Sequence, residues 1–473
     1  MGEPEQSLED LLRLAEWSPR QLVAAINARL SSQGRDRMRL DPTAGYSWVR
    51  RGFRPRPPVP DIAAAVLSDR LGFTLTPAQL WPGRADPGDP ICATNDLDTV
   101  VSPQYLANEL GKLAVIAGTP RSPIAPASGA DLAGAVIDQF RGTVKAAYGR
   151  SGQDRVLPEQ VDLISAHVAA LRRLDDRHGG GALSLRYVTA ELRSVLDLVE
   201  HSSYDPVTGR RLLTLVADVA QLLGWLSFDS GRTGPAERYL LLSLGVCRSL
   251  DDAGRAANVI GMLSYVSAFA GHGIGAVRLA EAAMAECAKP GPVLRARLLG
   301  RDATAAAADG DLVRFRRQSA EAAVLLHRHT ASAQSSSFLY YLTAEQLAAE
   351  TGLALVLLAE RASMGRKRLL TQAIDALSDA VPALSRPDRA DGRAGFPRSA
   401  LLHAAFLARA WLLHGDLEGA VAAMRTGVSL LDQVQSPRAR SYLQSLRPVL
   451  ARRSRSPVVR DFLDEIREAS SPM

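Results

Sequence analysis

The chain has 473 residues, of which 47% are hydrophobic, 22% are charged and 5% are aromatic. This composition is that of a folded chain and excludes a disordered one, and at about 150 residues per domain the length allows about three domains. Three cysteines exclude a disulfide framework, and a net charge of +6 indicates a partner only if the arginines are clustered.

Residues 1–84 form the first predicted domain, which contains five short helices. Ser18 followed by Pro19 is a typical helix start, because serine caps free backbone N–H groups and proline fits the first helical position. Asp41 begins another helix, which Gly52 ends. The helices are expected at residues 8–15, 19–30, 42–51, 60–71 and 76–80.

Positive charge is concentrated in residues 20–56 of this domain. The segment holds nine arginines and two aspartates, a net charge of +7 against +6 for the whole chain, so the rest of the chain is slightly acidic. A basic cluster of this kind is the electrostatic footprint of a DNA-binding surface. The alternative is a solvated arginine rim on a small domain.

The end of the third predicted helix carries a motif. Residues 46–57 read YSWVRRGFRPRP and resemble the pattern S-R-W-E-R-G-x-R-x-P, which ends the third helix in the phage-repressor type of helix-turn-helix, the XRE family. The matching residues are Ser47, Arg51, Gly52, Arg54 and Pro55. The sequence departs from the family in two ways: the loop before the third helix is longer, and Arg50 stands where glutamate is common.

The resemblance implies double-stranded DNA as a partner and assigns roles to six residues. The start of the third helix would enter the major groove, where Thr43 and Ser47 would approach base edges. The phosphate contacts would come from the arginines at the other end of this helix, Arg50, Arg51, Arg54 and Arg56. Trp48, in the middle of the helix, is predicted to anchor the core, and the alternative is that it stacks on a base.

Residues 85–130 are predicted to form a linker, because prolines and glycines interrupt them repeatedly. One short helix is expected within the linker, at residues 103–116. Residues 131–473 are rich in alanine and leucine with a 3.6-residue periodicity, which predicts helices almost throughout. The predicted fold class is therefore all-α.

Helical repeats are indicated by four glycines that each follow a helical run, Gly231, Gly271, Gly310 and Gly415. We compared three positions around each glycine: seven residues before it, five residues after it and twelve residues after it. Of these twelve positions, eleven hold small residues, and Phe315 is the exception. Small residues let two helices pack closely, and glycine adopts the turn that joins them. The pattern resembles the tetratricopeptide repeat and implies an α-solenoid. Gly352, 42 residues after Gly310, is a candidate for a further copy, which departs from the pattern at Glu345 and Leu357.

A solenoid of this kind curves and leaves a concave groove, which is its usual binding surface. The candidate groove residues lie on the first helices of repeats or beside them: Tyr265, Phe269, Tyr340 and Tyr341. The alternative for each of these residues is an ordinary position in the core. The groove is expected to take a small signal molecule, a peptide or a partner protein.

No arrangement of catalytic or metal-binding residues stands out in the sequence. The eight histidines include no H-E-x-x-H pair, and there is no nucleophile elbow or phosphate-binding loop. We therefore predict no enzyme activity, no cofactor and no metal site. Residues 256–277 lack Asp, Glu, Lys and Arg, and they are predicted to form a buried helix followed by a turn, with no membrane span.

The whole architecture resembles a group of actinobacterial transcriptional regulators, the type that restrains differentiation and antibiotic production in Streptomyces. This resemblance implies DNA binding by the N-terminal domain and a sensing role for the repeats. Such regulators usually read paired half-sites, so a homodimer formed by the repeats is expected. The polar start of the chain predicts no signal peptide and a cytoplasmic, nucleoid-associated protein. The alternative function is a protein-interaction scaffold whose N-terminal domain no longer binds DNA.

Overall fold

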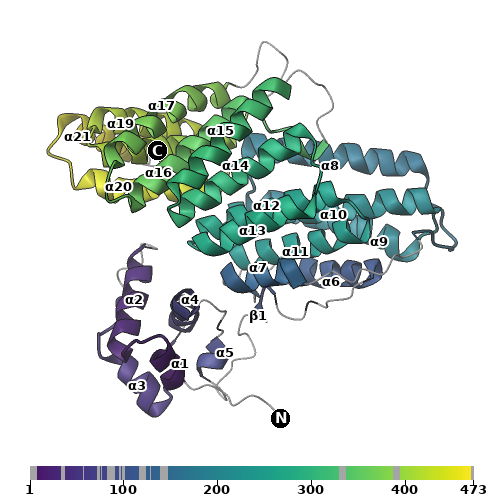
Figure 1. The fold of residues 1–473 in the computed structure, drawn as a ribbon, viewed down its shortest axis with the longest axis horizontal. Coiled ribbons are helices and arrows are strands. Elements are labelled where there is room, and N and C mark those ends of the chain that lie inside the picture. The colour runs from purple at the N-terminus through teal and green to yellow at the C-terminus, as the bar shows by residue number, and fades with distance from the viewer. Residues whose placement is uncertain are drawn as a thin grey trace.

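The structure is a computed structural model, and its described residues are almost entirely helical (Figure 1), so the predicted all-α class is confirmed. One short parallel pair of strands, β1 (Ile91–Cys92) and β2 (Ile124–Ala125), accompanies the helices. The described residues are 8–32, 38–56, 58–71, 75, 77–81, 91–94, 97, 102–116, 124–127, 129–138, 148–329, 337–386 and 395–469.

Five helices form a small N-terminal unit with its own core. They are α1 (Leu8–Leu14), α2 (Pro19–Ser32), α3 (Ala44–Arg51), α4 (Val59–Leu71) and α5 (Pro77–Leu80). The helices lie close to their expected positions, although the expected start of the fifth at Thr76 falls outside the described residues. Trp48 is buried in this core, with its ring centroid 6.2 Å from that of Trp81. The rings meet edge to face, which suits their quadrupoles.

Gly45 lets α3 pack tightly against the start of α2. A Cβ at this position would lie 2.5 Å from the backbone oxygen of Pro19 and 3.1 Å from Cγ2 of Val23. The backbone atom cannot rotate away, so only glycine fits without moving α3. Asn27 of α2 also holds the segment before α3, because its side chain donates to the oxygen of Leu40 and accepts from the nitrogen of Leu40.

We predict that Gly45→Ala destabilises the N-terminal unit by about 1–3 kcal/mol, the usual cost of overpacking a core. The measurement is urea unfolding of the full chain followed by tryptophan fluorescence. The matched control is Gly111→Ala, in a helix where an added Cβ meets nothing within 4 Å. That change should be neutral or slightly stabilising, since alanine favours helix. Equal stability of the two variants would contradict the packing assigned to Gly45.

The remaining helices form what we call the helical stack, α6–α21. Its members are α6 (Pro103–Ile116), α7 (Gly129–Asp138), α8 (Pro158–His178), α9 (Ala182–His201), α10 (Pro206–Asp229), α11 (Thr233–Ser249), α12 (Ala253–Phe269), α13 (Gly273–Glu286), α14 (Pro292–Asp309), α15 (Leu312–His329), α16 (Ala344–Arg361), α17 (Arg366–Ser385), α18 (Pro397–His414), α19 (Leu417–Leu430), α20 (Pro437–Ala451) and α21 (Pro457–Ala469). From α10 onward, consecutive helices pack as pairs, and each pair also contacts the next, as in an α-solenoid.

The turns between paired helices lie where the sequence predicted them. The φ angles are +75° at Gly231, +92° at Gly271, +92° at Gly310 and +100° at Gly415. Side chains with a Cβ rarely adopt this left-handed conformation, so the glycine pattern followed a real backbone requirement.

Gly352 marks a real helix pair, but the prediction placed it in the wrong role. The residue lies inside α16, and a Cβ there would be 2.6 Å from Cγ of Leu377 in α17. Gly224 has the same role in α10, where a Cβ would be 2.7 Å from Cγ of Leu240. The turn of the Gly352 pair is instead at Gly365, with a φ of +71°. Both a tight turn and a close helix contact select glycine, which explains the error.

The described part of the predicted linker packs against the stack. The expected helix at 103–116 is α6, which contacts α9 and α11. Leu106 and Leu110 on α6 are fully buried in the same core as α10–α12. Strand β2 lies so close to α11 that a Cβ on Gly234 would be 2.3 Å from the backbone oxygen of Ile124.

Helix α8 lies on the inner side of the stack, between its early and late helices. It packs against both α10 and α18. The oxygen of His178, at its C-terminal end, accepts a hydrogen bond of 2.6 Å from the nitrogen of Gln435, just before α20. Helix α8 therefore covers the inner side of the stack, and a pocket remains between it and the other helices.

One described helix, Pro206–Asp229, has the length and apolar composition of a membrane span, but 83% of that apolar window is buried in the protein. This is the behaviour of a core helix. The uncharged run at 256–277 forms most of α12, a turn at Gly271 and the start of α13, as the sequence predicted.

Candidate functional site

Two places in the molecule have the composition of a binding site, and the first is the exposed side of α3. We call it the arginine face, and it comprises the six residues that the sequence predicted for DNA, Thr43, Ser47, Arg50, Arg51, Arg54 and Arg56. Gly45 and Trp48 hold the opposite side of α3 in the core. Gly52 ends the helix with a φ of +58°, and the chain then continues through Arg54 and Arg56.

The hydroxyl groups of the two predicted base-contacting residues donate hydrogen bonds within the chain. Thr43 is exposed, and its hydroxyl and its backbone nitrogen both donate to a carboxylate oxygen of Asp41. The Thr43 hydroxyl bond, followed by the backbone bond, lowers the pKa of Asp41. Ser47 is half-buried, and its hydroxyl donates to the oxygen of Ala44 over 2.8 Å. Both hydroxyl oxygens can still accept, which suits the amino group of cytosine or adenine.

Three of the four arginines on this face are exposed: Arg50, Arg51 and Arg56. The fourth, Arg54, is half-buried. The guanidinium of Arg50 lies 5.6 Å from the ring centroid of Tyr46, which orients it along the helix surface. Flexible exposed arginines suit phosphate contacts, because a guanidinium can bind a phosphate with two parallel hydrogen bonds.

Sequence reasoning missed the apolar side chains beside the arginines. Met38, Tyr46 and Phe53 are 41%, 38% and 53% exposed. Met38 and Phe53 lie outside the helical periodicity of α3, so the pattern gave no signal for them. Exposed apolar side chains within a basic surface are typical of a contact surface.

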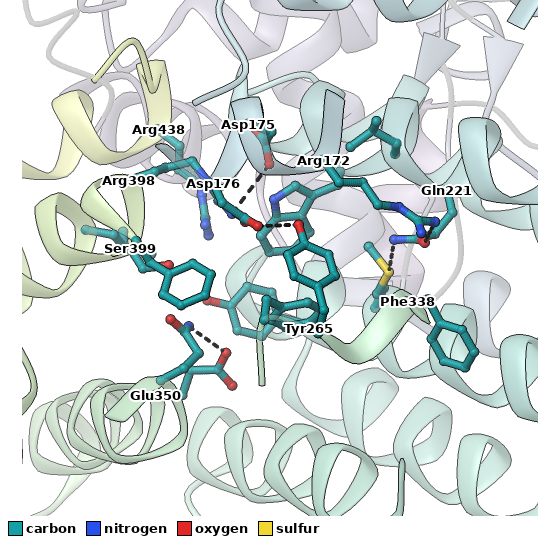
Figure 2. A pocket seen from close by; sticks show the side chains of 18 of the residues that line it. Arg172, Asp175, Asp176, Gln221, Tyr265, Phe338, Glu350, Arg398, Ser399 and Arg438 are labelled. Atoms are coloured by element: carbon teal, nitrogen blue, oxygen red, sulfur yellow. Dashed lines mark hydrogen bonds and ion pairs between the residues drawn. The ribbon is translucent and has the colours of Figure 1, made fainter. Parts of the chain in front are cut away.

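The second site is an enclosed pocket on the inner side of the stack (Figure 2). Its walls come from α8, from the first helix of each pair (α10, α12, α14, α16, α18 and α20), and from Phe338, Tyr340, Tyr341 and Phe396, which lie between α-helices. The pocket together with the open solvent at its mouth measures about 750 Å³. The lining residues are Arg172, Asp175, Asp176, Gln221, Leu222, Trp225, Met262, Tyr265, Arg301, Phe338, Tyr340, Tyr341, Gln346, Glu350, Phe396, Arg398, Ser399, Leu402, His403 and Arg438.

Three of the four predicted groove residues line this pocket: Tyr265, Tyr340 and Tyr341. The fourth, Phe269, lies behind the wall, with its ring centroid 4.6 Å from that of Tyr265. Phe269 packs there against Phe406, so it belongs to an aromatic cluster that supports the pocket. The prediction that these residues bind a ligand stays a prediction.

Three arginines surround the indole ring of Trp225. The guanidinium carbons lie 5.3 Å, 5.6 Å and 5.9 Å from a Trp225 ring centroid for Arg398, Arg438 and Arg301, respectively. Arg301 also lies 4.1 Å from the ring centroid of Tyr265. In Figure 2, Arg398 and Arg438 lie together at one end of the pocket. Aromatic faces attract guanidinium groups, more strongly where water is excluded.

Buried carboxylates partly balance these arginines. Nη2 of Arg398 lies 3.5 Å from Asp175 and 3.3 Å from Asp176. Asp229 is shared, at 3.6 Å from Nε of Arg438 and 3.9 Å from Nη1 of Arg398. Burial raises the pKa of Asp175 to about 7, even though Arg398 opposes the shift. The negative charge of Asp175 is therefore incomplete at neutral pH.

The pKa of Glu350 is shifted in the opposite direction from that of Asp175. It accepts hydrogen bonds from the fully buried Arg297 and from Gln346, and Arg301 lies 3.8 Å away. Burial alone would raise the pKa of Glu350, but the charges of Arg297 and Arg301 outweigh it and lower the pKa to about 2. Burial lowers the pKa of the neighbouring His403 to about 4, so His403 is neutral at pH 7.

Several buried polar atoms around the pocket have no hydrogen-bond partner among the described residues. The donors are Nε of Arg398, Nε and Nη1 of Arg438, and Nη1 of Arg301; the acceptors are Oδ1 of Asp175 and Oε1 of Gln346. Such atoms are rare in folded proteins and often mark a bound group. Among the described residues, no cluster of His, Cys, Asp and Glu could hold a metal ion.

The sequence gave little signal for this charged lining. Its charged residues come from five helices, α8, α14, α16, α18 and α20. Isolated arginines in an arginine-rich chain resemble surface residues. The available signal was charge on the apolar side of a buried helix, as in α14, where Arg297 and Arg301 lie one turn apart.

Comparison with known proteins gives one match. Residues 8–80, the whole of the N-terminal unit, match the SP15 N-terminal domain family. No curated protein and no solved structure is significantly similar to the chain.

Proposed function

We propose that the protein is a DNA-binding transcriptional regulator. In this proposal the N-terminal unit is an XRE-like helix-turn-helix domain in which α2 supports α3, and α3 enters the major groove. The helical stack is a tetratricopeptide-like solenoid that forms a dimer and takes a ligand or partner. The resemblance to actinobacterial regulators supports this proposal, and the family match over residues 8–80 supports treating the N-terminal unit as a separate domain.

The observation that carries the proposal is the arginine face. Arg50, Arg51 and Arg56 are exposed on the side of α3 that faces away from the core. The surrounding segment has a net charge of +7, so positive charge is concentrated around this face. Localised positive charge attracts the phosphate backbone, releases counterions and supplies most of the non-specific affinity for DNA.

The test is selection of duplexes from a randomised DNA pool by the full chain. We expect a sequence motif with two half-sites to be enriched. Binding of that duplex should weaken steeply as salt increases. If the pool shows no enrichment and random duplex does not bind at low salt, the alternative function as a protein-interaction scaffold is favoured.

The proposed dimer would form through the helical stack. Exposed apolar side chains lie on α8 and α9, where Leu163, Leu174 and Tyr187 are 70%, 47% and 59% exposed. Exposed apolar side chains often mark contact surfaces, so these suit contact with a second copy.

We predict that the full chain sediments as a dimer at micromolar concentration and that Leu163→Glu makes it a monomer. Buried glutamate without a partner opposes association, while the exposed position of Leu163 spares the fold. The matched control is Val313→Glu, at a 79% exposed site on α15, which should leave the dimer intact. A wild-type monomer would contradict the proposed assembly.

A further inference from the structure

We infer that the enclosed pocket binds a small organic acid, with the acid group held by Arg301, Arg398 and Arg438 and an apolar body held by the aromatic walls. This inference deepens the ligand-sensing role in the proposed function and rests on it. It names the chemical class of the ligand and the side chains that recognise it.

The first step is the set of unused donors. The side chains of Arg301, Arg398 and Arg438 are 5%, 9% and 8% exposed, so solvent cannot satisfy their N–H groups. Each has at least one buried nitrogen with no hydrogen-bond partner among the described residues. Leaving a buried charged donor unsatisfied is costly, so an acceptor supplied by a ligand would be strongly favoured.

The second step is the charge. Two buried carboxylates each serve two arginines: Asp229 serves Arg398 and Arg438, and Glu350 serves Arg297 and Arg301. Asp175 and Asp176 add negative charge beside Arg398. Formally these four carboxylates balance the four guanidinium groups, so the lining has no net negative charge that would oppose an anion. Most of the unpartnered polar atoms are guanidinium donors, which an anionic group can satisfy and an amine cannot.

The third step is the shape and chemistry of the remaining walls. Trp225, Tyr265, Tyr341 and Phe338 supply aromatic surface, and Met262 supplies a flexible apolar side chain. Sites that hold small organic molecules combine such apolar walls with a few convergent polar groups. Each of the four carboxylates already forms an ion pair with at least one arginine, which makes it less suited to hold a metal or an amine.

Two further lining residues, Tyr340 and Ser399, bear on how a ligand would fit in the pocket. Tyr340 is the most exposed of the lining aromatic residues, at 37%, and its hydroxyl donates to Asp176. Ser399 lies near Arg398 at the same end of the pocket (Figure 2). A larger side chain at Ser399 would take up ligand space without removing any charge.

The test measures binding of two matched probes to the full chain by calorimetry, without DNA. The probes are 2-naphthylacetate, which has an apolar ring system and a carboxylate, and 2-naphthylacetamide, its neutral counterpart. We expect the acid to bind and the amide to bind at least about tenfold more weakly, as for the loss of a charged hydrogen bond. No binding of the acid, or equal affinity for both probes, would overturn the inference.

Two variants locate the site. Arg438→Met should weaken binding of the acid by about 10–100-fold and leave the affinity for the amide unchanged. Asp229 keeps Arg398 and the Ser436 hydroxyl, 2.9 Å away, so the fold should survive this change. Ser399→Phe should weaken binding of both probes. Ser445→Phe, at an exposed site on α20, should change the affinity for neither probe. Acid binding that is unaffected by both pocket variants would place the probe elsewhere and overturn the inference.

A final comparison separates this inference from the proposed function. DNA affinity is measured with and without saturating 2-naphthylacetate. An acid that binds the pocket without changing DNA affinity would support the site and contradict the sensing role, because a ligand acts only through different affinities for two states. A chain that binds DNA but not the acid would contradict the inference and leave the DNA-binding role standing.

Discussion

Replacing Arg51 and Arg56 together with alanine is expected to weaken binding of the full chain to every duplex, by about 10–100-fold at moderate salt. Both side chains are exposed on the arginine face, so their loss should leave the fold intact. Each phosphate contact releases about one counterion, so the slope of log affinity against log salt should become flatter by about two. Fluorescence anisotropy of a labelled duplex over a range of salt concentrations measures both quantities.

The control for this prediction removes the same charge elsewhere. Arg447 and Arg455 are exposed arginines at the C-terminal end of the stack, and their double alanine variant has the same net charge as the test variant. The control should bind DNA with nearly the wild-type slope. If the two variants lose affinity equally, net charge alone drives binding and the arginine face has no special role.

Glu350→Ala is expected to destabilise the helical stack by about 3–5 kcal/mol, the usual cost of removing one partner from a buried ion pair. The variant leaves the fully buried guanidinium of Arg297 without a carboxylate, and Arg301 loses its nearest one. Urea unfolding of the full chain measures the change. Glu321→Ala is the control, because its pair with Arg295 is 40–45% exposed and should contribute about 1 kcal/mol or less.

The same pair predicts a dependence on pH. The pKa of Glu350 is about 2 in the folded chain against an ordinary value of 4.5, so its carboxylate stabilises the fold above about pH 4.5. That contribution is lost as the pH falls from about 4.5 toward 2. The stability difference between wild type and Glu350→Gln should therefore shrink over this range. A difference that stays constant would mean that the charge of Glu350 is not what holds Arg297.

Local rules were enough to predict the helices of the N-terminal unit and the turns of the stack. Ser18-Pro19 and Gly52 act on the backbone within a few residues, so their effects can be seen without knowing the rest of the fold. The positive φ angles at Gly231 and Gly310 follow from the same kind of local constraint. These features are where sequence and structure agree most closely.

The pocket could not be predicted in the same way. Its closure depends on α8 lying across the inner side of the stack, a placement set by contacts between residues more than 200 positions apart, such as His178 with Gln435. Periodicity shows that Tyr265 and Phe269 lie on one helix, but not which of them meets the cavity. Gly352 was misassigned because close packing and a turn favour the same residue.

The most direct test of the central claim is hydrogen exchange of the full chain with and without the enriched duplex. The account predicts slower exchange in residues 38–56, where α3 and the segments on either side of it carry the arginine face, and unchanged exchange in α20 and α21. Protection confined to the helical stack, or no protection in residues 38–56 when the duplex is bound, would contradict DNA recognition by the N-terminal unit.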